Sequence, residues 1–270
     1  MNDNTKPTDV ELGLCVETVF REMPLQERMK RVADLGFGNV EFWLVDQAVS
    51  DPEALARWAE RAGVRITNLV IDGPECAMSG GLTDPGSRSQ WLARVATVMD
   101  YARQAGIGGA IVCTGNVVEG LSEEEMRRSV LDGLKATADL AEKADVTLLL
   151  EALNTTCDHP GYWLTSSDVG AGLCREVNSP RLRLLYDCYH MQIMEGDLIA
   201  TIRKNIQYIG HFHTAGVPGR HELDENQEIY YPAVMRAIVE TGFDGYVAHE
   251  YTPTRDPVQS LVQAVKACDV

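Results

Sequence analysis

The chain has 270 residues, of which 45% are hydrophobic and 24% charged, a balance that is ordinary for a soluble enzyme and too apolar for a disordered chain. Lysine and arginine total 24 against 40 aspartate and glutamate residues, which gives a formal net charge of −16. A protein that binds nucleic acid through phosphates needs a basic face, and so does one that binds an anionic membrane. We therefore expect neither partner.

Seven cysteines are widely spaced and include no CxxC pair, which is typical of free thiols in a reducing compartment. The N-terminal stretch MNDNTKPTDVELG has no apolar core, so a secretory signal is not expected. No window approaches the roughly 18 apolar residues of a membrane-spanning helix. The composition thus favours a cytoplasmic protein.

Short apolar runs and helical patterns alternate along the chain. The expected strands are 11–18, 39–45, 65–71, 109–115, 147–154, 182–189, 209–215 and 246–252. Each is a nearly continuous apolar run, as is typical of strands buried on both faces of a parallel sheet.

Helices are expected between these strands. They cover 24–36, 51–63, 122–145, 166–178, 197–206, 231–241 and 257–268. Pro24 and Pro52 suit the first helical position, and Asp51 suits the N-cap before the second of them. Ser122 and Glu125 have the spacing of a capping box. A glycine ends each of the first two helices.

Eight strands, each followed by a helix, in about 250 residues predict a single (β/α)₈ TIM barrel of the α/β class. An open doubly wound sheet is the alternative, but no glycine-rich phosphate loop follows the first strand. No linker rich in proline or serine divides the chain. We expect one domain over residues 1–270, in which residues 1–10 form a disordered or extended tail.

Ionisable residues interrupt the apolar runs near the C-terminal ends of four consecutive strands, where barrel active sites form. They are Glu151, Asp187, His190, His211, His213, His249 and Glu250. Three buried carboxylates that converge without a cation would repel one another. Glu151, Asp187, Glu250 and one imidazole therefore predict a divalent metal site, with Mn²⁺ or Mg²⁺ favoured and Zn²⁺ or Co²⁺ as alternatives.

Alternation along the strand cannot separate His211 from His213, because the two share one face. His213 is favoured as the ligand since it lies nearer the C-terminal end, and His211 is expected one layer deeper. His249 should point away from Glu250. Glu41 also ends a strand, but no partner is evident from the sequence. The two remaining histidines, His159 and His221, are expected in loops, where a solvated side chain is one interpretation of each.

The segments LLLEALN, LLYDCYHMQIMEGDL, GHFHTAGVPGRHEL and GYVAHEYTP resemble the hydroxypyruvate isomerase family, within the xylose-isomerase-like TIM barrels that also include ketose 3-epimerases. The resemblance implies that Glu151 and Glu250 act as an acid/base pair and also hold the metal. It implies further that Asp187 is a metal ligand, that His190 contacts substrate, and that Arg220 binds substrate oxygens or a carboxylate. Typical hydroxypyruvate isomerases carry glutamine at the position of His213, whereas ketose 3-epimerases carry histidine.

These features predict a metal-dependent isomerase of a small hydroxy-carbonyl compound that acts through a cis-enediolate. Its expected substrate is hydroxypyruvate, tartronate semialdehyde or a related sugar acid, and a homo-oligomer is left open. A ketose 3-epimerase is the alternative. Remoter alternatives are a non-catalytic ligand-binding barrel and an endonuclease-IV-type nuclease. The nuclease is disfavoured because no histidine precedes His159 and the net charge is strongly negative.

Overall fold

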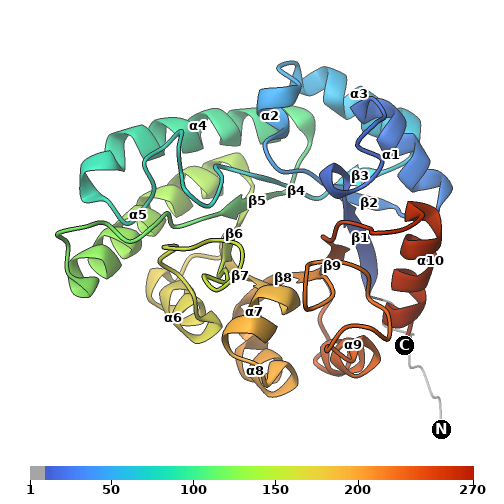
Figure 1. The fold of residues 1–270 in the computed structure, drawn as a ribbon. Coiled ribbons are helices and arrows are strands. Elements are labelled where there is room, and N and C mark those ends of the chain that lie inside the picture. The colour runs from blue at the N-terminus through green and yellow to red at the C-terminus, as the bar shows by residue number, and fades with distance from the viewer. Residues whose placement is uncertain (1–9) are drawn as a thin grey trace, which may run out of the picture.

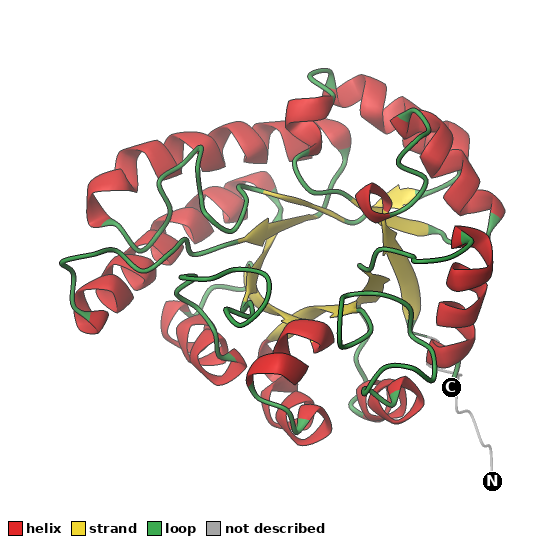
Figure 2. Ribbon diagram, viewed as in Figure 1, coloured by secondary structure: helices red, strands yellow, loops and turns green. Residues whose placement is uncertain are grey.

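The computed structural model describes residues 10–270, so the expected N-terminal tail lies outside the described residues except for its last residue. A ring of parallel strands is enclosed by helices (Figures 1 and 2). The strands are β1 (Glu11–Cys15), β2 (Asn39–Glu41), β3 (Arg65–Ile66), β4 (Asn68–Val70), β5 (Gly109–Val112), β6 (Thr147–Glu151), β7 (Leu182–Asp187), β8 (Ile209–Thr214) and β9 (Tyr246–His249).

The sheet has the order β3-β2-β1-β9-β8-β7-β6-β5-β4, so the first and last strands of the chain pair with each other. β3 and β4 belong to the single run expected over 65–71, and Thr67 separates them. The Thr67 N–H donates to Val40 O, and the Phe42 N–H donates to Asn68 O. β3 and β4 stand at opposite ends of the strand order but are consecutive in the chain, and these hydrogen bonds connect both of them to β2 and the residue after it, which closes the barrel. The predicted TIM barrel is confirmed.

The helices are α1 (Leu25–Asp34), α2 (Val45–Ala48), α3 (Pro52–Ala62), α4 (Arg88–Ala105), α5 (Glu123–Ala144), α6 (Ser167–Val177), α7 (Cys188–Met194), α8 (Leu198–Asn205), α9 (Tyr231–Glu240) and α10 (Pro257–Cys268). Every expected helix is present within two residues of its predicted ends. The sequence interpretation assigned no bounds to α2, α4 or α7. Among the described residues, none of these helices has the length and apolar character needed to cross a membrane.

The helix ends show which local signals were correct. Asp51 caps α3 by accepting hydrogen bonds from the N–H groups of Glu53 and Ala54. Ser122 and Glu125 form the predicted capping box at the start of α5. Pro24, however, is the N-cap of α1 rather than its first helical residue.

All eight expected strands end earlier than predicted, because the residues that follow them leave the sheet. The run 182–189 shows the reason most clearly. Its strand stops at Asp187, where the carboxylate accepts hydrogen bonds from the N–H groups of Tyr189 and His190 and thereby caps α7. The polar residues at the strand ends thus lie where the sheet opens into loops.

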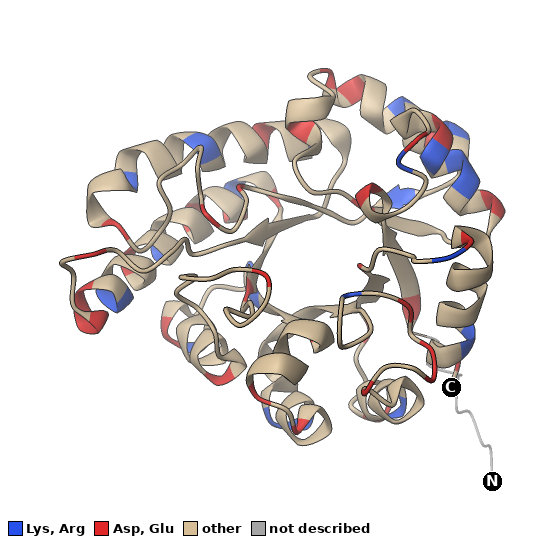
Figure 3. Ribbon diagram, viewed as in Figure 1, with Lys and Arg blue, Asp and Glu red and all other residues tan. Residues whose placement is uncertain are grey.

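Alternation divides each strand between two environments. Leu148 and Leu150 of β6 face the helices, whereas Leu149 belongs to a separate apolar cluster with Val70, Ile111 and Leu185. Glu151 follows Leu149 by two residues, so it points to the same side, toward the barrel interior. Asp187 follows Leu185 by two residues on β7, so it also points toward the barrel interior. On the outer helices, acidic and basic residues are intermingled (Figure 3).

Candidate metal centre and active-site cavity

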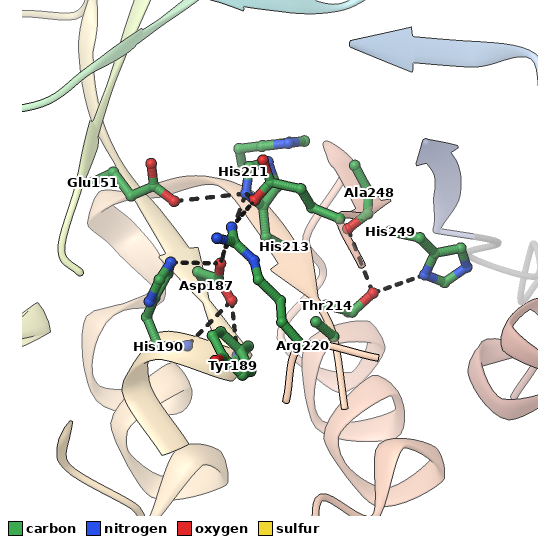
Figure 4. Close-up of polar contacts among 12 residues, drawn as sticks. Glu151, Asp187, Tyr189, His190, His211, His213, Thr214, Arg220, Ala248 and His249 are labelled. Atoms are coloured by element: carbon green, nitrogen blue, oxygen red, sulfur yellow. Dashed lines mark hydrogen bonds and ion pairs between the residues drawn. The ribbon is translucent and has the colours of Figure 1, made fainter. Parts of the chain in front are cut away.

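Four predicted ligands meet at the C-terminal mouth of the barrel, and Figure 4 labels three of them, Glu151, Asp187 and His213. Glu151 ends β6, Asp187 ends β7, His213 lies on β8, and Glu250 directly follows β9. One ligand atom from each residue lies within 4.8 Å of those from the others, and all four residues are buried. The strand register aligns Asp187 with His213, which explains why these two side chains are neighbours.

The Nδ1 atom of His213 faces all three carboxylates. It lies 3.2 Å from Glu250 Oε2, 3.6 Å from Glu151 Oε1 and 3.9 Å from Asp187 Oδ2. Within residues 10–270 this buried nitrogen has no hydrogen-bond partner. A buried nitrogen without a partner, surrounded by three carboxylate groups, is a donor set of the kind that a divalent cation would satisfy. The residues therefore fit a metal ion.

Glu41 has partners that the sequence did not reveal. Its Oε2 lies 2.9 Å from His211 Nε2 and accepts a hydrogen bond from Asn68 Nδ2 at 3.0 Å. Its Oε1 lies 2.8 Å from His213 Nε2, although the two groups are not aligned for a hydrogen bond. Glu41 thus contacts the side of the His213 ring that faces away from the cluster. Such a carboxylate fixes the orientation of a ligating imidazole.

Burial alone would raise the pKa of Glu41, but the imidazoles of His213 and His211 outweigh it and lower the pKa to about 2. Burial would likewise lower the pKa of His213, yet Glu41 and Glu250 outweigh it and hold that pKa well above its usual range. Because a ligating imidazole must be neutral, a cation that binds here would release a proton.

Asp187 is buried within the cluster. Burial raises its pKa to about 7, even though Arg220 and His213 act in the opposite direction. A divalent cation would reverse this shift, since it favours the charged form. Its Oδ1 is used by the α7 cap, and Oδ2 is the oxygen that faces His213.

His190 lies beside the cluster at the start of α7. Its Nδ1 accepts a hydrogen bond from the Asn154 N–H at 3.2 Å. Burial, reinforced by the positive charge of Arg220, holds its pKa well below the usual range. The ring is therefore neutral and carries its proton on Nε2, which lies 3.5 Å from Asp187 Oδ2, and the residue lines the cavity. His190 can donate a hydrogen bond to a substrate oxygen.

Among the described residues that line the cavity, Arg220 is the one that brings a guanidinium. Its Nη2 contacts Glu250 Oε2 directly and lies 3.8 Å from Asp187 Oδ2, and its guanidinium also lies 5.5 Å from the centre of the Tyr189 ring. The backbone of Arg220 is left-handed, with φ 58°, and its carbonyl accepts a hydrogen bond from the Thr252 N–H. The loop after β8 thus directs a positive charge at two of the predicted ligands.

These residues border a cavity of about 280 Å³. Its apolar side is formed largely by leucine, valine and isoleucine side chains, and its polar side by three residues of the ligand cluster together with His159, His190 and Arg220. The lining residues are Trp43, Leu44, Val70, Gly73, Pro74, Ile111, Cys113, Glu151, Leu153, His159, His190, His213, Arg220 and Glu250. Small-molecule sites commonly combine an apolar wall with a few convergent polar groups.

The remaining predicted residues differ in outcome. His249 points away from the cluster, packs against Phe37 and contacts the Thr214 hydroxyl, as expected (Figure 4). His221 is exposed, also as expected. His159 is a loop residue but not a solvated one, since its side chain is only 18% exposed and lines the cavity. The loop after β6 folds inward there, which sequence pattern alone does not reveal.

Trp43 is a cavity residue that the sequence interpretation missed. It follows β2 by two positions, and its indole Nε1 donates to Glu250 Oε1 at 2.5 Å. The only sequence signal is an aromatic residue just beyond a strand end in NVEFW. Its partner is 207 residues away along the chain, so no local pattern could have identified the pair.

Comparison with known proteins places the chain in a family. The family model described as "Xylose isomerase-like TIM barrel" matches residues 29–268. The chain belongs to this family. It is 32% identical over 236 residues to a 2-oxo-tetronate isomerase of Cupriavidus necator, covering 87% of this chain and 90% of that protein. The predicted resemblance and the prediction of an isomerase of this family are both confirmed.

Two further proteins are also similar over most of their length and of this chain. A human protein named putative hydroxypyruvate isomerase is 31% identical over 246 residues, covering 88% of this chain and 87% of that protein. A solved structure described as an AP endonuclease, family 2, from Brucella melitensis matches with a TM-score of 0.87 and 28% identity, covering 95% of this chain and 98% of that chain. The similarity to these proteins therefore extends over nearly the full length of the chain.

Proposed function

We propose that this chain is a metal-dependent isomerase of small 2-oxo hydroxy acids, which it interconverts through a cis-enediolate. The observation that carries the proposal is the buried cluster of Glu151, Asp187, His213 and Glu250, of which all but Asp187 line a cavity of about 280 Å³. The relatives named 2-oxo-tetronate isomerase and hydroxypyruvate isomerase support the substrate class.

The four cluster residues would hold the cation, with Mn²⁺ or Mg²⁺ favoured by three carboxylates and one imidazole. When bound, such an ion stabilises negative charge that develops on substrate oxygens. The two glutamates come from β6 and from the end of β9, with two strands between them in the sheet. They are the candidates from which the group that moves the carbon-bound proton would come.

Other cavity residues would orient the substrate. Arg220 offers a guanidinium that can bind the carboxylate of a 2-oxo acid, which favours an acid over a neutral sugar. The neutral His190 can donate its Nε2 proton to a substrate oxygen. The cavity has room beyond a three-carbon compound, so we expect four-carbon acids to be accepted as well as hydroxypyruvate.

A ketose 3-epimerase is the second candidate, and the observation that favours it is His213 itself. The cluster uses an imidazole at the position where hydroxypyruvate isomerases are expected to carry glutamine. Arg220 is the counter-argument, because its charge suits an acid. The nuclease alternative is disfavoured by the net charge of −16, since a phosphate backbone would be repelled.

The test is proton NMR in D₂O with hydroxypyruvate, both enantiomers of the four-carbon 2-oxo acid, and a panel of ketoses. Each is incubated with Mn²⁺ and, separately, with chelator, and aliquots are quenched and freed of metal before spectra are recorded. We expect metal-dependent deuterium exchange and isomerisation of the acids. Exchange confined to C3 of the ketoses would instead support the epimerase. The Glu151→Gln variant should stay folded and lose turnover, and undiminished turnover would refute the assignment of Glu151.

A further inference from the structure

The two glutamates of the cluster differ in what surrounds their oxygens. Both oxygens of Glu250 are engaged by donors of this chain. Oε1 accepts the Trp43 indole N–H at 2.5 Å, and Oε2 is contacted by Arg220 Nη2. An indole N–H can donate a hydrogen bond but cannot accept a proton, and the guanidinium stays charged. Each oxygen of Glu250 therefore already has a donor from this chain, and Oε2 is the one that also faces the cluster, 3.2 Å from His213 Nδ1.

Glu151 has the opposite surroundings. In the part of the chain that the structure describes, its side chain makes no hydrogen bond, and the nearest charged contact is His213 Nδ1 at 3.6 Å from Oε1. The residue lines the cavity against the apolar wall. If one oxygen of Glu151 binds the cation, the other is still free. The corresponding second oxygen of Glu250 is covered by Trp43.

This asymmetry bears on the choice between the two candidate reactions, and it rests on the proposed function. Transfer of a proton between adjacent carbons on one face of a planar enediolate needs a single base. Inversion at one carbon needs a second group that delivers a proton to the opposite face. We propose that Trp43 is a positioning residue that removes Glu250 from proton transfer, so that Glu151 alone moves the proton and the enzyme isomerises without epimerising.

The proton balance is closed. The proton on the hydroxyl-bearing carbon passes to the free oxygen of Glu151, and its bonding electrons form the double bond of the enediolate. Glu151 returns the proton to the former carbonyl carbon on the same face, using that electron pair for the new C–H bond. The original hydroxyl proton moves to the other oxygen and leaves a carbonyl behind. No oxidant or co-reactant is consumed.

The first measurement needs no turnover. The chain has four tryptophans, so ¹⁵N-indole labelling gives four N–H signals, and Trp43→Phe identifies the one from Trp43. A short bond to a carboxylate should shift this signal downfield in the metal-free protein. The Glu250→Gln variant should move it upfield, because the acceptor loses its charge. A signal that does not respond to Glu250→Gln would overturn the proposal.

The second measurement follows the configuration at C3 of the substrate. Each enantiomer of the four-carbon 2-oxo acid, with its hydroxyl at C3, is incubated with wild type in D₂O and Mn²⁺. We expect isomerisation with no inversion at C3 in recovered substrate. The Trp43→Phe variant keeps an aromatic wall but frees Oε1, and should raise the ratio of inversion to isomerisation by roughly tenfold or more.

A matched control removes an indole-to-carboxylate hydrogen bond outside the cavity. Trp163 donates its indole N–H to Glu123 Oε2 at 3.1 Å and does not line the cavity, so Trp163→Phe should leave the ratio unchanged. Inversion by the wild type at a rate comparable with isomerisation would overturn only this division of roles. A Trp43→Phe variant with an unaltered ratio would do the same. Absence of exchange with every substrate would instead overturn the proposed function.

Discussion

Replacement of Glu41 by glutamine should weaken the protein in two separable ways. The substitution preserves size and removes one buried negative charge. The Glu41 side chain is 2% exposed and lies within 2.9 Å of two imidazoles. The neutral variant leaves His213 without the charge that now faces its Nε2, while the three carboxylates on the other side of the ring are untouched.

The size of the stability effect follows from the Glu41 pKa, which falls from 4.5 to about 2 in the folded chain. That shift corresponds to about 3 kcal/mol of unfolding free energy at neutral pH, as an order of magnitude. Because the folded pKa is depressed, this stabilisation is present above pH 4.5 and is lost as the pH falls toward 2. The variant should therefore be less stable than wild type at pH 7, and the difference should shrink in acid.

The effect on metal affinity comes from ring orientation. A carboxylate behind a ligating imidazole typically contributes 10- to 100-fold in affinity. Calorimetric titration with Mn²⁺ should show a loss of that order in Glu41→Gln, and the number of protons released on binding should fall, because His213 then has a lower pKa. Urea unfolding in chelator measures the stability term separately, without contribution from a bound cation.

Each readout can refute the reasoning. Equal unfolding free energies of the variant and wild type in chelator at pH 7 would show that the contacts of Glu41 with His211 and His213 contribute no net stability. Unchanged Mn²⁺ affinity would show that Glu41 does not orient the ligand. A loss of affinity without loss of stability would keep the second conclusion and reject the first.

Glu17 is the opposite case, because burial raises its pKa to about 7. Its ionisation therefore lowers the free energy of unfolding as the pH rises from 4.5 through 7. The Glu17→Gln variant should have a higher urea midpoint than wild type at pH 8 and the same midpoint at pH 4. Ser122→Ala removes the capping box of α5 and should cost about 1 kcal/mol in thermal unfolding. Asp46→Ala leaves the buried guanidinium of Arg94 unpaired and should cost about 3–5 kcal/mol in urea unfolding, whereas Asp34→Ala in an exposed pair should cost under about 1 kcal/mol.

The sequence by itself determined the barrel and the four residues of the candidate metal cluster. Continuous apolar runs with helices between them are a local signal, and eight repeats of it leave few architectures. Period-two alternation then placed Glu151 on the same face as Leu149, and Asp187 on that of Leu185. Because all parallel strands end at one rim, carboxylates at strand ends had to converge, and the predicted ligands Glu151, Asp187, His213 and Glu250 do lie together.

Only the tertiary structure decided which groups touch across the barrel. The strand that ends in Glu41 meets the β8 histidines 170 residues later in the chain, and the Trp43 indole reaches Glu250 over 207 residues. The interior turn of His159 depends on how the loop after β6 packs. These contacts follow from the closure and stagger of the barrel, which fix distances between strands that are not neighbours. Local periodicity gives the face on which a residue lies, whereas closure determines what it faces.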